Sequence, residues 1–332
     1  MTEPDPVLLE QRYRAVLRLL PASYRAERED EMVAAFMEMS GEVPDERGPR
    51  PRWDEIASVA ALAVRVRLGA PGAEPRLVAW GEAVRLVALL GVGFQALISL
   101  YSLLSLGAAA LLVEPPSARH IATTMANCAW IAAYLAVMRG HVRRAKAAAL
   151  VGCGSSLYVL ATGLPVEFLG WSEAAVALIL VTTMLALLAG FHRGVQPARR
   201  PWGRAVAPLA VAVLPLTLEA PLIALMNAMP PADSEGLMWA AFWLGPEGLA
   251  ILAVLVAGAV ALTRRRSPSV LLALATAGML LAAYRLPVGL PLEFNQPLWV
   301  TGVVQCGMLA VMVSLLLVTG IRALPAGRPA SL

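Results

Sequence analysis

Two glutamates lie inside strongly apolar stretches of this chain of 332 residues. Glu219 lies in PLTLEAPL and Glu247 in FWLGPEGL, and each is 14 residues from Asp233 (233 − 219 and 247 − 233). A helix rises 1.5 Å per residue, so we expect the two carboxyl groups at the same depth in a membrane. Such a pair can share a proton, bind a cation, or act as general acid and base.

The sequence predicts a polar cavity around these two acids. Pro215, Pro221 and Pro246 accompany them, and proline frees backbone carbonyls inside a helix. We expect three further side chains to line the outer side of the cavity: Asn227, Tyr284 and Gln305.

A purely structural alternative stays open for both acids. Each glutamate could be protonated and hydrogen-bonded to its neighbours, serving only packing. An acid in the bilayer core costs about 2.5–3.5 kcal/mol on insertion scales, and such residues usually mark pathways.

A second pair of acids lies in a repeated phrase. YVLATGLPVEF (158–168) and YRLPVGLPLEF (284–294) are identical at seven of eleven positions. The repetition predicts that Glu167 and Glu293 face each other at the outer surface, and Arg285 is a candidate partner for either. Trp171 and Trp299 would flank this outer vestibule. The alternative is a helix-ending turn that gene duplication has preserved.

The elements that must position these residues are membrane helices. Only 15% of the residues are charged, and the mean hydropathy is +0.68. The second part of the chain contains apolar runs of about 20 residues, the length that a helix needs to cross a bilayer. These runs lack the polar stripe that a soluble helix shows. The eight predicted spans are 86–113, 121–138, 147–166, 174–191, 205–229, 237–262, 268–286 and 298–320.

The charges between the spans predict the orientation. The even-numbered connections carry eleven basic residues and no acid, whereas the odd-numbered ones carry six acids and two bases. The positive-inside rule therefore predicts a multi-pass protein of the cell membrane with both termini in the cytoplasm. The basic balance thus reflects topology, and we expect no nucleic-acid partner.

The fold class that follows is an all-α integral membrane protein with eight transmembrane helices in two parallel four-helix repeats. An even number of spans in each half gives both repeats the same orientation. The predicted divisions are a cytoplasmic helical domain (1–70), a juxtamembrane linker (71–85), repeat 1 (86–193), repeat 2 (194–322) and a cytoplasmic tail (323–332).

The polar segment before the spans carries a phrase that resembles a known family. LEQRYRAVLRLLPASYRAEREDEMVAAFME, and within it RLLPASYRAEREDEM, is similar to the start of actinobacterial multi-pass proteins with HAAS-type or permease-prefix domains. The resemblance covers about residues 7–70. It implies a cytoplasmic sensing or partner-coupling domain, whose partner would be a cytoplasmic protein or an ABC-type ATPase.

Other chemistries lack their motifs. The chain has no GxSxG, HExxH, P-loop or aspartate-rich diphosphate motif, its three histidines lie in separate loops, and its three cysteines lie inside spans. We therefore expect no cofactor and no metal site. The predicted function is a membrane sensor or transport component that binds a cation or a hydrophobic small molecule. The alternative is an intramembrane acid/base enzyme acting on a lipid or isoprenoid, for example a membrane-integral cyclase.

Overall fold

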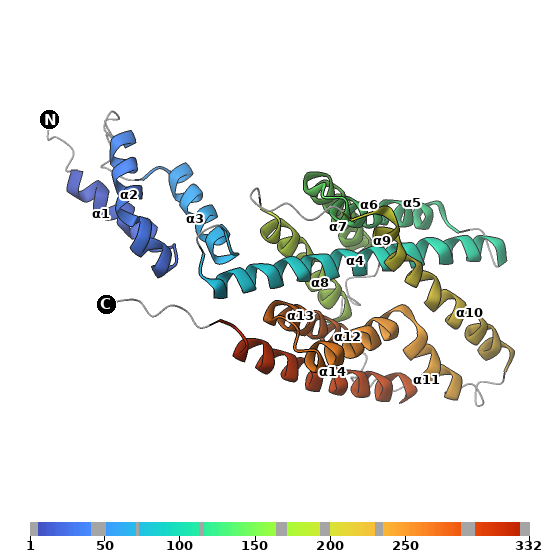
Figure 1. Ribbon diagram of the computed structural model, residues 1–332. Helices are drawn as coiled ribbons and strands as arrows, with labels where there is room; N and C mark the ends of the chain where they lie inside the picture. The colour runs from blue at the N-terminus through green and yellow to red at the C-terminus, as the bar shows by residue number, and fades with distance from the viewer. Residues whose placement is uncertain are drawn as a thin grey trace. The chain divides into compact units, whose positions relative to one another are not determined.

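The computed structural model describes eight stretches of the chain, and every regular element in them is helical (Figure 1). These stretches are residues 6–40, 51–70, 73–112, 116–163, 171–192, 200–229, 235–286 and 296–325. The chain divides into two compact units, Met1–Glu82 with Leu324–Leu332, and Ala83–Ala323.

The first unit is a small helical bundle with its own core. It contains α1 (Pro6–Leu17), α2 (Ala22–Ser40), α3 (Trp53–Arg67) and the start of α4 (Pro75–Leu112). The apolar residues of α1 recur with helical spacing, which places Tyr13 and Leu17 on one buried face. The Tyr13 ring stacks on that of Phe36 in α2, with centroids 3.9 Å apart. Because α4 begins at Pro75, part of the segment predicted as a linker is helical.

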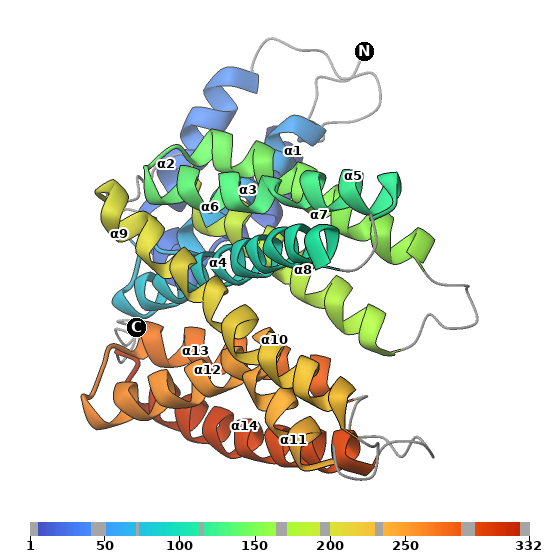
Figure 2. The same ribbon diagram turned by 90° about the vertical axis from the view of Figure 1, so that its right-hand side faces the viewer.

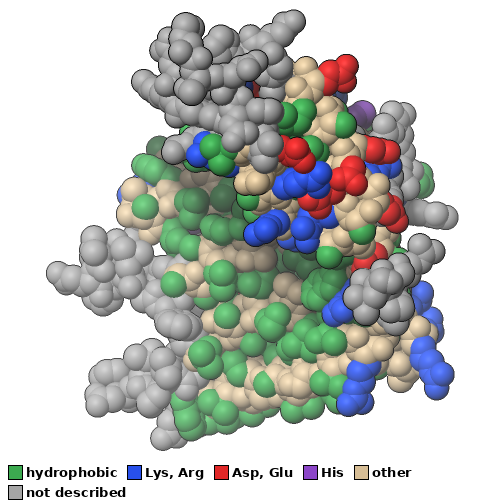
Figure 3. All heavy atoms as spheres, turned by 90° about the vertical axis from the view of Figure 1, so that its left-hand side faces the viewer, with side chains coloured by type: hydrophobic (Ala, Val, Ile, Leu, Met, Phe, Trp, Pro, Cys, Tyr) green, Lys and Arg blue, Asp and Glu red, His purple; other side chains and the backbone are tan. Residues whose placement is uncertain are grey.

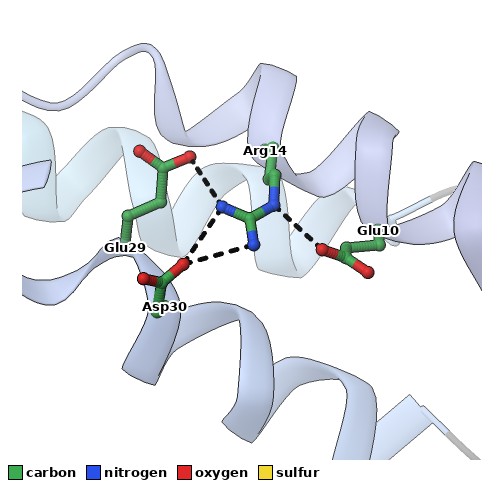
Figure 4. A network of polar contacts seen from close by, with 4 residues as sticks. All are labelled: Glu10, Arg14, Glu29 and Asp30. Atoms are coloured by element: carbon green, nitrogen blue, oxygen red, sulfur yellow. Dashed lines mark hydrogen bonds and ion pairs between the residues drawn. The ribbon is translucent and has the colours of Figure 1, made fainter.

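A charged network lies on the surface of this bundle (Figure 4). The Arg14 guanidinium donates to Glu10 at 2.9 Å, to Glu29 at 3.3 Å and to Asp30 at 3.2 Å. These bonds, led by the one to Glu10, raise the pKa of Arg14 above its ordinary value. The groups are solvent-exposed, so the network fixes the pairing of α1 with α2 more than it stabilises the fold.

The second unit contains the apolar helices. After α4 come α5 (Ala118–Asn127), α6 (Ala129–Met138), α7 (Val142–Gly163), α8 (Trp171–Gly190), α9 (Trp202–Val206), the 3₁₀ helix η2 (Ala207–Ala212), α10 (Val213–Ala228), α11 (Glu235–Leu244), α12 (Pro246–Thr263), α13 (Pro268–Arg285) and α14 (Gln296–Arg322).

Seven described segments are long and apolar enough to cross a membrane, as expected for a polytopic membrane protein. They are Pro75–Gly107, Ala118–Met138, Val142–Thr162, Pro208–Met226, Pro246–Thr263, Pro268–Arg285 and Trp299–Arg322. The remaining predicted span corresponds to a shorter apolar segment of α8, Ala174–Gly190. The eighth crossing therefore stays a prediction.

Two packed groups of helices make up the second unit. Helices α4, α6, α7 and α8 share a core that includes Val92, Trp130 and Leu187. Helices α12, α13 and α14 lie side by side in Figures 1 and 2 and pack on one another. Small residues allow this close approach, because a Cβ atom at Gly278 would lie 2.7 Å from Val313 Cγ2.

The surface differs between polar and apolar parts of the chain. Figure 3 shows acidic side chains, in red, interleaved with basic ones in one part of the view. Another, broader area is mostly hydrophobic, with basic side chains along one edge. Many apolar side chains of the second unit point outward, among them Leu185, Val256 and Val311, each at least 60% exposed. Such a surface suits contact with lipid.

The crossing of α4 and α8 yields a first prediction. A Cβ atom added at Gly91 would lie 2.8 Å from Cγ2 of the buried Thr183. Gly91→Ala is therefore expected to lower the free energy of unfolding by about 1–3 kcal/mol. Gly107→Ala is the matched control, because Gly107 lies on the same helix with no atom within 4 Å of an added Cβ. Thermal unfolding in detergent measures both, and equal midpoints would contradict the close approach of α4 to α8.

Candidate functional site

The site is built around a break between α11 and α12. Gly245 has an extended backbone (φ −64°, ψ 166°), and Pro246 is the first residue of α12. Proline has no N–H group, so the carbonyl of Phe242, four residues earlier, has no donor within the helix. Gly248 packs against backbone carbonyls of the last turn of α11, since an added Cβ would lie 2.6 Å from the oxygen of Trp243.

Glu219 lies at the α12 side of the break. The Tyr101 hydroxyl on α4 donates to Glu219 Oε2 at 2.9 Å. The other oxygen, Oε1, is 3.4 Å from the position that a Cβ atom of Gly245 would occupy. Gly245 is the N-cap of α12 and supplies no side-chain cap. The N-terminus of a helix carries a positive partial charge, so the carboxylate lies where it is electrostatically favoured.

Arg285 and Gln305 lie at the α11 side of the break. Arg285 Nη2 on α13 and Gln305 Nε2 on α14 each donate to the Phe242 carbonyl at 3.4 Å. Both side chains are buried, with 8% and 0% exposure. The C-terminus of a helix carries a negative partial charge, which favours a guanidinium there. The two side chains also supply the hydrogen bonds that Pro246 denies to this carbonyl.

A charged side chain thus lies beside each half of the broken helix. Glu219 Oε1 lies beside Gly245, the N-cap of α12, and Arg285 donates to a carbonyl in the last turn of α11. A carboxylate that gains a proton loses most of its attraction to a helix N-terminus and to a hydroxyl donor. The arrangement can therefore convert the binding of a proton or cation at Glu219 into a change at the break.

The structure places the predicted cavity residues at different points around the break. Glu247 is half-buried in the first turn of α12, next to the Gly245–Pro246 step that Glu219 touches. Gln305 lies at the other end of the break, and Tyr284 is half-buried on α13. Asn227 belongs to α10, but its side chain lies outside the described residues.

The predicted outer vestibule is only partly described. Arg285 is buried and bonded to the Phe242 carbonyl, and Trp299 is 39% exposed on α14. Glu167 and Glu293 lie outside the described residues, as does the side chain of Trp171 at the start of α8. The facing pair of acids therefore stays a prediction.

Sequence reasoning missed Tyr101 and the Phe242 carbonyl. Tyr101 is a lone tyrosine near the middle of the first apolar run, and a polar hydroxyl at that depth in a membrane span indicates a candidate site residue. The carbonyl follows from Pro246 by counting back four residues. The first group of helices has a neutral polar cluster instead, in which Ser156 donates to Asn127 Oδ1 at 3.1 Å and Trp130 Nε1 to Ser156 at 3.4 Å.

The described residues contain no group of three or more His, Cys, Asp or Glu side chains placed to hold a metal ion. The class that the helices define is that of polytopic membrane proteins. No protein family, curated protein or solved structure was found to match the chain. The resemblance of residues 7–70 to HAAS-type domains therefore stays a prediction.

The Tyr101 hydrogen bond yields a second prediction. Tyr101→Phe keeps the ring and removes the donor to Glu219, so we expect the free energy of unfolding to fall by about 1.5–3 kcal/mol, as for a hydrogen bond to a charged group. Tyr158→Phe on α7 is the control, because that side chain is 57% exposed. Denaturant unfolding in detergent compares the two variants. Equal losses would show that the Tyr101 hydroxyl does not stabilise the carboxylate.

Proposed function

We propose that this chain is a membrane transport or sensor protein in which Glu219 binds and releases a proton or another cation. One observation carries the proposal. The Glu219 carboxylate lies between the Tyr101 hydroxyl and the N-terminus of α12, inside apolar helices. An ionisable side chain in such a place is a functional site by default.

The mechanism follows from the charges at the break. With Glu219 ionised, the carboxylate accepts the Tyr101 hydrogen bond and neutralises the end of α12. Binding of a proton weakens both interactions at once. Tyr101 belongs to α4 and Glu219 to α10, so the loss removes a link between these two helices. Secondary transporters use broken helices in this way, with half-helix ends at the ion site.

The membrane arrangement that we propose keeps eight spans in two parallel four-helix repeats, both termini in the cytoplasm. The helix order supports the duplication. In each half the second predicted span consists of two helices, and the first of these has 10 residues, Ala118–Asn127 in α5 and Glu235–Leu244 in α11. Only the second half carries a proline and acids at this point, so the repeats have diverged where the site lies.

We assign the first unit to signalling. Its helices enclose a core of their own, which is a requirement for a domain that binds a partner while the spans change state. The partner would be a cytoplasmic protein or an ATPase subunit. A sensor passes the state of Glu219 to this partner, and a transport component couples it to movement of a solute.

The alternative of an intramembrane acid/base enzyme requires a carboxylic acid that gives its proton to an apolar substrate. In the structure Glu219 is the acceptor of the Tyr101 hydrogen bond, and its other oxygen lies beside the N-cap of α12. The geometry therefore favours cation binding over acid catalysis.

Difference infrared spectroscopy of the protein in lipid nanodiscs, titrated from alkaline to acidic pH, tests the proposal. We expect a carboxyl C=O band to grow together with a backbone amide change, and Glu219→Gln to remove both. Glu219→Asp, which keeps the acid, should retain a titrating band. A titrating carboxyl without any backbone change would reduce Glu219 to a packing role.

A further inference from the structure

The Phe242 carbonyl is the feature that the proposed site leaves unexplained. Gly245 N donates to the Ala241 carbonyl at 2.9 Å, and the Phe242 carbonyl is the next one along α11, for which Pro246 has no N–H to offer. An unpaired backbone carbonyl inside a membrane helix is costly, because no water is present to satisfy it. Two long polar side chains from two other helices converge on this single oxygen.

The way in which these side chains converge is specific to the carbonyl. Arg285 Nη2 and Gln305 Nε2 each donate one hydrogen bond to the Phe242 carbonyl oxygen, both at 3.4 Å. Two of their other polar atoms, Arg285 Nε and Gln305 Oε1, are buried without a hydrogen-bond partner among the residues that the structure describes. Residues placed only to stabilise the core would be expected to satisfy all of their polar atoms. Their position is therefore set by the oxygen that they hold.

We propose that Arg285 and Gln305 are positioning residues that keep α11 and α12 apart by holding the Phe242 carbonyl outside the helical ladder. With the carbonyl held, α12 begins at Pro246, and its N-cap Gly245 lies beside Glu219. The part of the inference that concerns Glu219 rests on the proposed function. The part that concerns the break does not.

Pro246 makes the inference testable by a double-mutant cycle. Pro246→Ala restores an N–H that can bond to the Phe242 carbonyl within one continuous helix. Gln305→Leu removes a donor to the same carbonyl. If Gln305 acts through this oxygen, its substitution in the otherwise wild-type chain lowers the thermal midpoint by about 3–6 °C. In the Pro246→Ala background the same substitution should have little effect.

A second readout follows the geometry itself. Spin labels at Gly236 on α11 and Val256 on α12, both exposed, report the distance across the break by double electron–electron resonance. A continuous helix would separate them by about 30 Å, at 1.5 Å per residue. We expect Pro246→Ala to lengthen the distance toward this value, and Gln305→Leu to broaden or shift it. Thr276→Val on α13, whose hydroxyl donates to the Leu272 carbonyl of its own helix at 2.9 Å, is the control.

The third readout separates positioning from support of the fold. In the infrared titration, Gln305→Leu and Pro246→Ala should both shift the pH midpoint of the Glu219 band, because the end of α12 turns away from the carboxylate. Arg285→Lys, which keeps a cationic donor, should retain more of the wild-type midpoint than Arg285→Met.

The outcomes are distinguishable. Equal thermal effects of Gln305→Leu in the wild-type and Pro246→Ala backgrounds would overturn the inference, and so would an unchanged label distance in both variants. If Arg285→Met does not fold, the thermal cycle and the label distances of Gln305→Leu test the inference without it. If the wild-type protein shows no titrating Glu219 band, the proposed function fails, while the thermal cycle and the distances still decide what holds the break.

Discussion

Glu219→Gln is expected to reduce strongly the pH-dependent ion movement across a membrane that contains the purified protein. Glutamine keeps the length of the side chain and can still accept the Tyr101 hydrogen bond, but it takes up no proton and carries no charge toward α12. Coupling between two sites typically amounts to about 1–3 kcal/mol, so we expect the pH-dependent component to fall about 5- to 150-fold. Proteoliposomes with an entrapped pH indicator, subjected to an imposed pH step, provide the measurement.

Two controls sharpen this experiment. Thr217→Val lies on the same helix, and the Thr217 hydroxyl donates to the Leu214 carbonyl of that helix, so wild-type behaviour is expected. Glu219→Asp keeps the charge and should retain part of the response. A sensor that moves no ion would give the wild-type protein and the protein-free liposomes the same trace, while keeping the infrared signal. An unaltered response in Glu219→Gln would contradict the assignment of this carboxyl group.

Gly248→Ala is expected to produce the largest loss of stability among substitutions at the break. A Cβ atom there would clash with the carbonyl oxygen of Phe242 and lie 2.6 Å from that of Trp243. Both are backbone atoms, which cannot rotate away, so the first turn of α12 must move. We expect the free energy of unfolding to fall by about 3 kcal/mol or more, at the upper end of overpacking effects.

The control for this prediction is Gly307→Ala on α14. An added Cβ at Gly307 has no atom within 4 Å, so the change should be neutral or slightly stabilising through its higher helix propensity. Thermal unfolding and the yield of monodisperse protein in detergent measure both. If Gly248→Ala unfolds like Gly307→Ala, the carbonyls of α11 do not pack on α12.

The sequence was sufficient to predict which stretches become apolar helices. The runs 268–286 and 298–320 correspond closely to α13 and α14, because a hydrocarbon core requires about 20 apolar residues with every backbone group satisfied. The prediction was coarser where hydropathy does not vary. The single run 237–262 is two helices, α11 and α12, and the run 205–229 comprises α9, η2 and α10.

The contacts at the site depend on the direction in which each helix turns its side chains, and hydropathy does not predict that direction. Counting residues put Glu219 and Glu247 at one depth, and the structure places both at the same helix break. The partner of Glu219 is Tyr101, 118 positions away in the chain, and no pattern in either segment relates them. Arg285 was predicted to pair with an acid of the outer vestibule, whereas the structure shows its long side chain bonded to the Phe242 carbonyl.

The most direct test is a structure of the protein in lipid nanodiscs at alkaline and at acidic pH, determined by electron cryo-microscopy with a bound antibody fragment. At alkaline pH we predict two helices that meet at Gly245, the Glu219 carboxylate beside that glycine, and the Tyr101 hydroxyl within hydrogen-bond distance of it. At acidic pH the carboxyl group and the end of α12 should separate. One continuous helix through residues 235–263, or a Glu219 side chain that faces lipid at both pH values, would contradict the account.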